Sequence, residues 1–154
     1  YWWFPDGESE PVQWPIPPKS SPEGIHEGRL LVSLKQDWTP TGQETTFKSG
    51  DLVAFDVETF METRALPPVS LVFHPSETQA LKGVSTAKGA LLLGVGDTAV
   101  GKVMRATASD AGWMLEPISL PGTGQASVAF ASDEEDTVFI NYEDFLTPDS
   151  LLSY

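Results

Sequence analysis

The chain has 154 residues, 40% of them hydrophobic and 20% charged, a composition typical of one folded soluble domain and not of a disordered chain. Its 22 acidic and 9 basic residues give a net charge of −13, which repels phosphate backbones and anionic lipid headgroups. We therefore expect neither nucleic acid nor a membrane as a partner.

Cysteine is absent, which excludes disulfides, thiol nucleophiles and thiolate metal sites. The compartment stays undecided on this ground, with the cytoplasm slightly favoured.

The first residues, Tyr1 to Phe4, lack the basic region of a signal peptide and an initiating Met. We expect from this a processed or excised fragment of a longer protein.

Residues 1–28 form the first predicted unit, a Pro/Gly-rich N-terminal segment. Within it, residues 15–18 (PIPP) must be extended, because each proline fixes its own φ and pushes the preceding residue away from the helical region. The turn-rich stretch 5–28 has no repeating composition, so we expect an ordered surface loop there and not a low-complexity linker.

Strand signals recur through the second predicted unit, residues 29–154. They are short apolar or alternating runs at 29–35, 51–57, 69–73, 81–87, 90–95, 102–108, 113–120, 125–131, 138–142 and 150–154. Turn residues such as Lys88-Gly89 separate them. The only predicted helices are short, at 58–62 and 142–146. Strands of about four to eight residues at this spacing predict an all-β fold, either an antiparallel sandwich, a barrel or a propeller.

The strand pattern also has an internal period. Residues 81–120 contain four strand signals within about forty residues, the length of one four-stranded propeller blade. Residues 29–73 match most of a preceding blade, and residues 125–154 match three strands of a following one. The pattern therefore predicts antiparallel four-stranded sheets in a partial β-propeller of about two to three blades.

Two glycine-containing stretches resemble motifs that bind phosphate or activate a serine. Residues 94–101 are glycine-rich but lack the following helix that would present amides to a phosphate, so we interpret them as a hairpin connection. Residues 83–87 (GVSTA) match only the first half of a Gly-x-Ser-x-Gly elbow, because Ala87 replaces the second glycine. No catalytic serine is assigned.

Other polar and aromatic groups also have simpler structural interpretations. His74 and Glu77 lack a positioned nucleophile, so we interpret 74–78 as a turn. The acidic run 133–136 lacks the Gly and the distant Glu of an EF-hand loop and is interpreted as a solvated turn. The Trp2-Trp3 pair is expected to fill a core or an edge. We assign no catalytic, cofactor-binding or metal-binding residue and expect no cofactor.

Four segments in order resemble one known family. Residues 28–39 (GRLLVSLKQDWT), 48–56 (KSGDLVAFD), 71–86 (LVFHPSETQALKGVST) and 132–148 (SDEEDTVFINYEDFLTP) are similar to motifs in the N-terminal propeller of prolyl oligopeptidase family serine peptidases. The chain departs from the family pattern at Gln79 or Thr78, one of which stands where a basic residue is usual, and at the glycine-rich stretch 94–101. The resemblance runs from about residue 25 to residue 154.

The resemblance implies a non-catalytic segment of a bacterial peptidase. In this family the propeller covers the cleft of a separate α/β-hydrolase domain and admits only short peptides. That domain carries the Ser, Asp and His of the triad, and none of its motifs exists here, so no catalytic residue is carried over. The implied partners are the hydrolase domain of the parent protein and peptide substrates.

The last strand signal, 150–154, runs to the end of the sequence, as expected of an excised part of a propeller. Unpaired sheet edges would then be exposed, and we expect a homodimer or strand exchange through them. The alternative is a stand-alone acidic β module that binds a peptide or protein partner, for example by strand addition.

Overall fold

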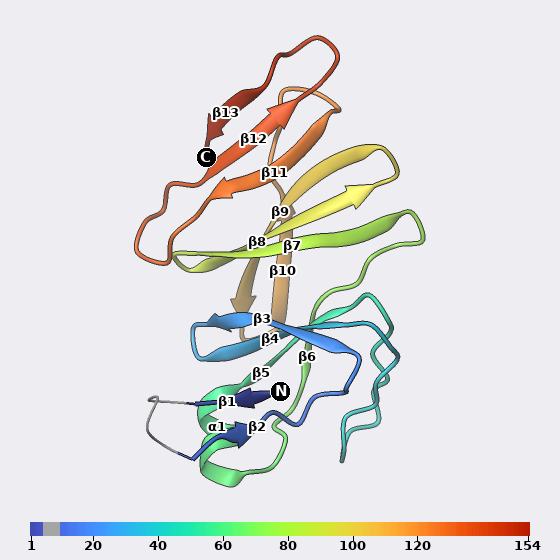
Figure 1. Cartoon of the computed structure of the whole chain (residues 1–154), viewed down its shortest axis with the longest axis vertical. Coiled ribbons are helices and arrows are strands. Elements are labelled where there is room, and N and C mark those ends of the chain that lie inside the picture. Colours follow the sequence, from blue (N-terminus) through green and yellow to red (C-terminus); the bar gives the residue numbers. More distant parts are fainter. Residues whose placement is uncertain (5–9) are drawn as a thin grey trace.

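The fold is described from a computed structural model, which covers residues 1–4 and 10–154. The turns predicted at Pro5, Asp6 and Gly7 lie outside these residues. The described strands form one two-stranded ribbon and three larger sheets, all antiparallel (Figure 1). The three larger sheets follow one another along the long axis of the molecule in chain order.

The ribbon pairs β1 (Trp2–Trp3) with β2 (Val12–Gln13). The first large sheet contains β3 (Ser20–His26), β4 (Arg29–Leu34), β5 (Leu52–Asp56) and β6 (Ser70–Phe73), in that order. The second contains β7 (Gln79–Ala87), β8 (Ala90–Asp97), β9 (Val100–Ser109) and β10 (Gly112–Pro117), again in order. The third contains β11 (Gln125–Phe130), β12 (Phe139–Glu143) and β13 (Ser150–Ser153).

The predicted fold class is confirmed: the chain is nearly all β, and its sheets form part of a propeller and not a closed barrel. Each of the ten predicted strands corresponds to one of β4 to β13. The structure adds β3, which lies in the stretch predicted as a surface loop. β3 pairs with β4, so the first sheet begins at Ser20. The division into residues 1–28 and 29–154 stays a prediction.

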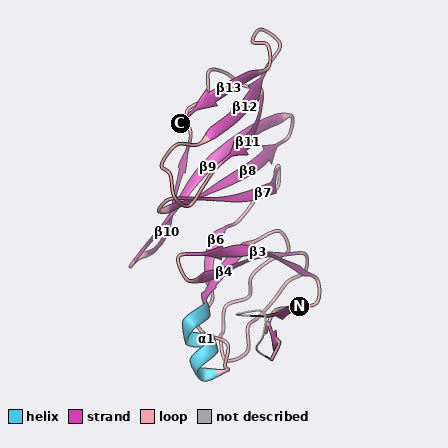
Figure 2. Cartoon of the chain, turned by 60° about the vertical axis from the view of Figure 1, so that its left-hand side comes forward, coloured by secondary structure: helices cyan, strands magenta, loops and turns pink. Residues whose placement is uncertain are grey.

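One of the two predicted helices exists. α1 (Val57–Thr63) begins at Asp56, whose carboxylate accepts a hydrogen bond from the Thr59 N–H at 2.7 Å (Figure 2). The helix predicted at 142–146 is wrong. Tyr142 continues β12, and the chain then turns because the Asp144 carboxylate accepts from two backbone N–H groups ahead of it. Within the described part of the chain, no helix could span a membrane.

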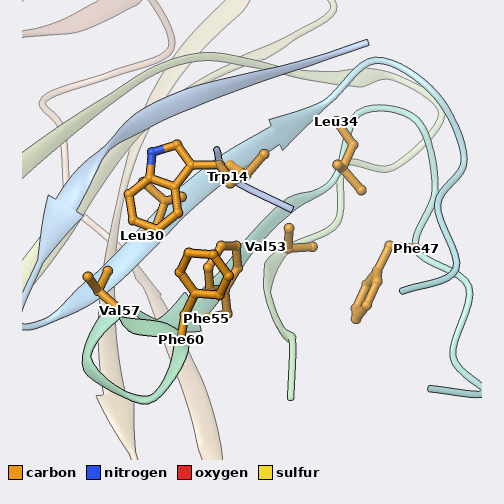
Figure 3. Close-up of a cluster of buried hydrophobic side chains, with 9 residues drawn as sticks. Trp14, Leu30, Leu34, Phe47, Val53, Phe55, Val57 and Phe60 are labelled. Carbon is orange, nitrogen blue, oxygen red and sulfur yellow. The ribbon is translucent and has the colours of Figure 1, made fainter. Parts of the chain in front are cut away.

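The core of the first sheet lies on the face that β1, β2 and α1 cover. Trp14 is its centre and packs against Phe55 and Phe60, with ring centroids 6.0 and 5.5 Å away (Figure 3). Trp3 stacks on Trp14 at 5.0 Å. The turn-rich segment before β3 therefore supplies a large aromatic side chain to the core, which fixes that segment on the sheet.

Two further cores lie between neighbouring sheets. Leu31 and Ala54 of the first sheet are fully buried against Leu91 and Leu93 of the second. On the opposite face of the second sheet, Leu92 packs with residues that include Ile140 of the third sheet. Because side chains alternate along a strand, β8 sends successive leucines to two different neighbours. This explains its continuous apolar run in place of a polar–apolar alternation.

Glycine allows the second and third sheets to approach closely. A Cβ on Gly101 in β9 would overlap the backbone nitrogen of Ala126 and lie 2.9 Å from its carbonyl oxygen in β11. The Gly101 N–H also donates to the carbonyl of Gly124 at 2.9 Å. The glycine-rich stretch is therefore a packing surface, because only a residue without a side chain fits between these backbones.

We expect Gly101→Ala to destabilise the chain by about 1–3 kcal/mol, because the new methyl group meets backbone that cannot rotate away. Urea unfolding would measure the loss. Gly94→Ala is the matched control, since its Cβ would have its nearest contact at 3.7 Å. Equal effects of the two substitutions would contradict the close approach at Gly101.

Candidate functional site

The first strand of each large sheet is an edge strand, and these three strands lie on one side of the molecule. β3, β7 and β11 succeed one another along the long axis (Figure 1). We call this side the inner edge. An edge strand presents unpaired backbone N–H and C=O groups, so the inner edge can pair with or guide an extended chain.

A bulge recurs in each strand of the inner edge. One extra residue interrupts the pairing with the second strand of the sheet: Glu23 in β3, Lys82 in β7 and Ala129 in β11. All three residues are exposed. Because a bulge bends its strand and changes the direction of a side chain, the repeat places one outward residue on each inner strand.

Cavities separate the strands of the inner edge. One of about 400 Å³ lies between the first and second sheets and includes Glu23, Lys35 and Lys82 in its lining. A second of about 250 Å³ lies between the second and third sheets and has Lys82 and Ser127 in its lining. Lys82 thus belongs to both cavities, at the middle of the inner edge.

The connection between the first two sheets is fixed by Asp97, at the end of β8. Its carboxylate accepts hydrogen bonds from Lys102 Nζ at 2.7 Å, Thr78 Oγ1 at 2.8 Å and Gln79 Nε2 at 3.2 Å. These donors, with the Lys102 ammonium first, lower the pKa of Asp97 to about 2. Thr78 and Gln79, one of which departs from the family pattern, therefore both bind this carboxylate.

The two histidines are paired with aspartates and not with a serine or with Glu77. His74 Nδ1 lies 2.6 Å from Oδ1 of the buried Asp51. His26 is buried, and its Nδ1 lies 3.7 Å from Asp133 Oδ1 in the loop between β11 and β12. The described residues hold no cluster of three or more His, Cys, Asp or Glu side chains that could bind a metal ion.

The remaining sequence candidates lie in regular structure or in packing. Residues 83–87 belong to β7, and residues 94–101 form the hairpin of β8 and β9. Residues 133–136 lie in the loop between β11 and β12. Trp3 stacks in the core, while Trp2 is 63% exposed. None of these groups brings a nucleophile next to a base.

The sequence analysis did not assign the bulged residues of the inner edge. A signal was present at one of them, because Gly83 stands inside the predicted strand 81–87 directly after Lys82, and an isolated glycine in a strand often marks a bulge. Gly24 follows Glu23 in the same way, but it lies in the stretch predicted as a loop. The third bulge, at Ala129, has no glycine after it and no comparable signal.

Similar proteins are peptidases. The uncharacterized peptidase y4nA of Sinorhizobium fredii is 28% identical over 150 residues, which are 96% of this chain and 20% of that protein. A post-proline cleaving enzyme from Rickettsia typhi has the same fold over 94% of this chain and 21% of its own, with a TM-score of 0.78 and 20% identity. No protein-family model matches. The chain thus spans about a fifth of the length of each relative.

The acid stability of the chain should depend on Asp97. A pKa lowered to about 2 in the folded state means that the unfolded chain, with an ordinary value of 3.8, binds the proton more tightly. The carboxylate therefore stabilises the fold above about pH 4, and this contribution is lost as the pH falls toward 2.

We expect Asp97→Asn to be less stable than wild type at pH 7 and equally stable below about pH 2. Urea unfolding of both proteins at several pH values would measure the difference. Asp110→Asn, in the turn between β9 and β10, is the control for removal of one acidic charge. A stability difference that does not change with pH would contradict the role of Asp97.

Proposed function

We propose that this chain, which is similar in sequence to a peptidase and in fold to a post-proline cleaving enzyme, is a non-catalytic propeller segment of a prolyl oligopeptidase-like peptidase that limits the access of peptides to a hydrolase domain. One observation carries the proposal: three successive sheets stack in the manner of blades, with the first strand of each on a common inner edge. Catalysis by a Ser–His–Asp triad would belong to residues outside this chain.

The packing suits a filter that does not deform. In the first two sheets, β5 and β8 are buried on both faces, and close-packed cores have low compressibility. Their inner strands are therefore held by cores on either side. Peptides that pass the inner edge would meet backbone edges and the bulged side chains of Glu23 and Lys82.

A second candidate function is a stand-alone acidic module that binds a peptide or protein. The observation in its favour is the third sheet, which has three strands and carries exposed Leu151 and Phe130, 61% and 53% accessible. β13 is an edge strand, so it can pair with a strand of another chain. The same edge is the proposed contact for a homodimer.

The native protein distinguishes the two functions. An antibody against this segment would isolate it from its source cells for measurement of its mass and of its labelling by a serine-reactive fluorophosphonate. We expect a labelled protein several times larger than 16.7 kDa. Recombinant 154-residue chain is the control and should stay unlabelled. An unlabelled native protein of 16.7 kDa would reject the peptidase segment and favour the binding module.

Edge pairing through β13 can be blocked by one substitution. Tyr154 and Val138 exchange both of their backbone hydrogen bonds, so the alternation of an antiparallel ladder points the Ser153 N–H away from β12. Ser153→Pro therefore removes an outward donor without removing a bond inside the sheet.

We expect the wild-type chain to dimerise at micromolar concentration and Ser153→Pro to shift it to monomer. Light scattering after size exclusion would give the masses, with Ser153→Ala as the control that keeps the N–H. A wild-type chain that is monomeric throughout, or a proline variant that dimerises as well as wild type, would contradict pairing at this edge.

A further inference from the structure

The cavity between the second and third sheets has an unusual electrostatic character for this protein. The whole chain carries 22 acidic residues and 9 basic ones, yet Lys82 is the only charged residue among the described residues that line this cavity of about 250 Å³. The remaining lining residues are glycine, small apolar residues, Gln125 and two serines, Ser85 and Ser127. The cavity is therefore a local positive site on an acidic molecule.

The backbone around Lys82 creates room for its side chain. Lys82 is the extra residue of the bulge in β7, so its side chain points in a different direction from the side chains of its neighbours in the strand. Its alkyl stem lies across Gly96 in β8, because a Cβ built on Gly96 would be 2.7 Å from Lys82 Cε and 3.5 Å from Cγ. The missing side chain at Gly96 is what accommodates the lysine.

The ammonium group of Lys82 forms no ion pair with a described residue, whereas Lys48 and Lys102 are held by Asp37 and Asp97 at 2.9 and 2.7 Å. Glu23 lines the neighbouring cavity, where it accepts a hydrogen bond from the Ser33 hydroxyl. An exposed ammonium at a cavity, without a carboxylate partner among the described residues, is suited to an anionic ligand, because a charge-assisted hydrogen bond is stronger than a neutral one.

We propose that this cavity binds a carboxylate group of a peptide. Lys82 supplies the ammonium, and Ser85 supplies a hydroxyl donor. The volume of about 250 Å³ lies below the range of about 300–1,000 Å³ that holds a drug-sized ligand, so the cavity fits the end of a peptide and not its whole length. The carboxylate is either the peptide's C-terminus or an acidic side chain.

This inference deepens the proposed function and rests on it, because it names the chemistry that a peptide would meet at the inner edge. A peptide whose carboxylate is held at Lys82 would extend along β7 or β11, whose outer backbone groups are unpaired.

The binding test uses the 154-residue chain and nuclear magnetic resonance of its backbone amides. The probes are N-acetyl-dialanine with a free carboxylate, the same peptide as its C-terminal amide, an amidated peptide with one glutamate, and acetate. We expect the free-acid peptide to shift the amides of Gly83, Gly96 and Gly101, which line the cavity, and the amide peptide to leave them unchanged. The glutamate probe separates a side-chain carboxylate from a C-terminal one, and acetate separates a peptide from any small anion.

Three variants locate the interaction. Lys82→Gln should weaken binding by at least about tenfold, as expected when a hydrogen bond to a charged group is lost. Gly96→Ala keeps the charge of Lys82, but the new methyl group displaces the end of the flexible Lys82 side chain. It should therefore weaken binding while the fold is preserved. Lys88→Gln, in the exposed turn between β7 and β8, removes the same charge outside the cavity and should bind as wild type does.

Equal shifts by the acid and amide peptides, or an equal loss in Lys82→Gln and Lys88→Gln, would overturn the carboxylate site. Absence of saturable shifts at millimolar peptide would do the same. The test is independent of the fluorophosphonate experiment. Specific binding by the chain from an unlabelled native protein of 16.7 kDa would support the cavity while rejecting the peptidase segment.

Discussion

The face-to-face packing of successive sheets is the constraint on which the other features of this chain depend. In the first two sheets, β5 and β8 must be apolar on both faces, because one face meets the neighbouring sheet and the other meets a second core. Burial of this kind removes polar residues from these two strands, so that polar residues lie in β9, at strand ends, in turns and along the edge strands. The inner edge of β3, β7 and β11 is therefore where the molecule can present chemistry to a ligand.

Close packing also determines which small residues are needed. Gly101 allows the backbone of β11 to approach β9, and Gly96 allows the stem of Lys82 to lie flat on β8. A stretch that looks like a phosphate-binding loop in the sequence is instead the surface on which two sheets meet. The same glycines leave the cavity around Lys82, so packing and the proposed carboxylate site have one structural origin.

Two aspartates beside turns have strongly lowered pKa values. Asp97 and Asp144 are held by hydrogen bonds in turns, and these bonds lower the pKa of each carboxyl to about 2. Asp144 holds the backbone of its turn, whereas Asp97 joins side chains of β7, β9 and the segment before β7. The chain spans about a fifth of the length of the peptidases that it resembles, and the triad is proposed to lie outside it.

The sequence by itself determined the fold class, the ten strands from β4 to β13 and the helix α1, because strand alternation, turn residues and a helix cap are local patterns. Its motifs also determined the family resemblance. Only the tertiary structure decided that Trp14 enters the core, that His74 meets Asp51, and that Lys82 lines a cavity without an acidic residue. These features arise between segments far apart in the sequence, where sheet packing and bulge geometry, and not local propensity, set the distances.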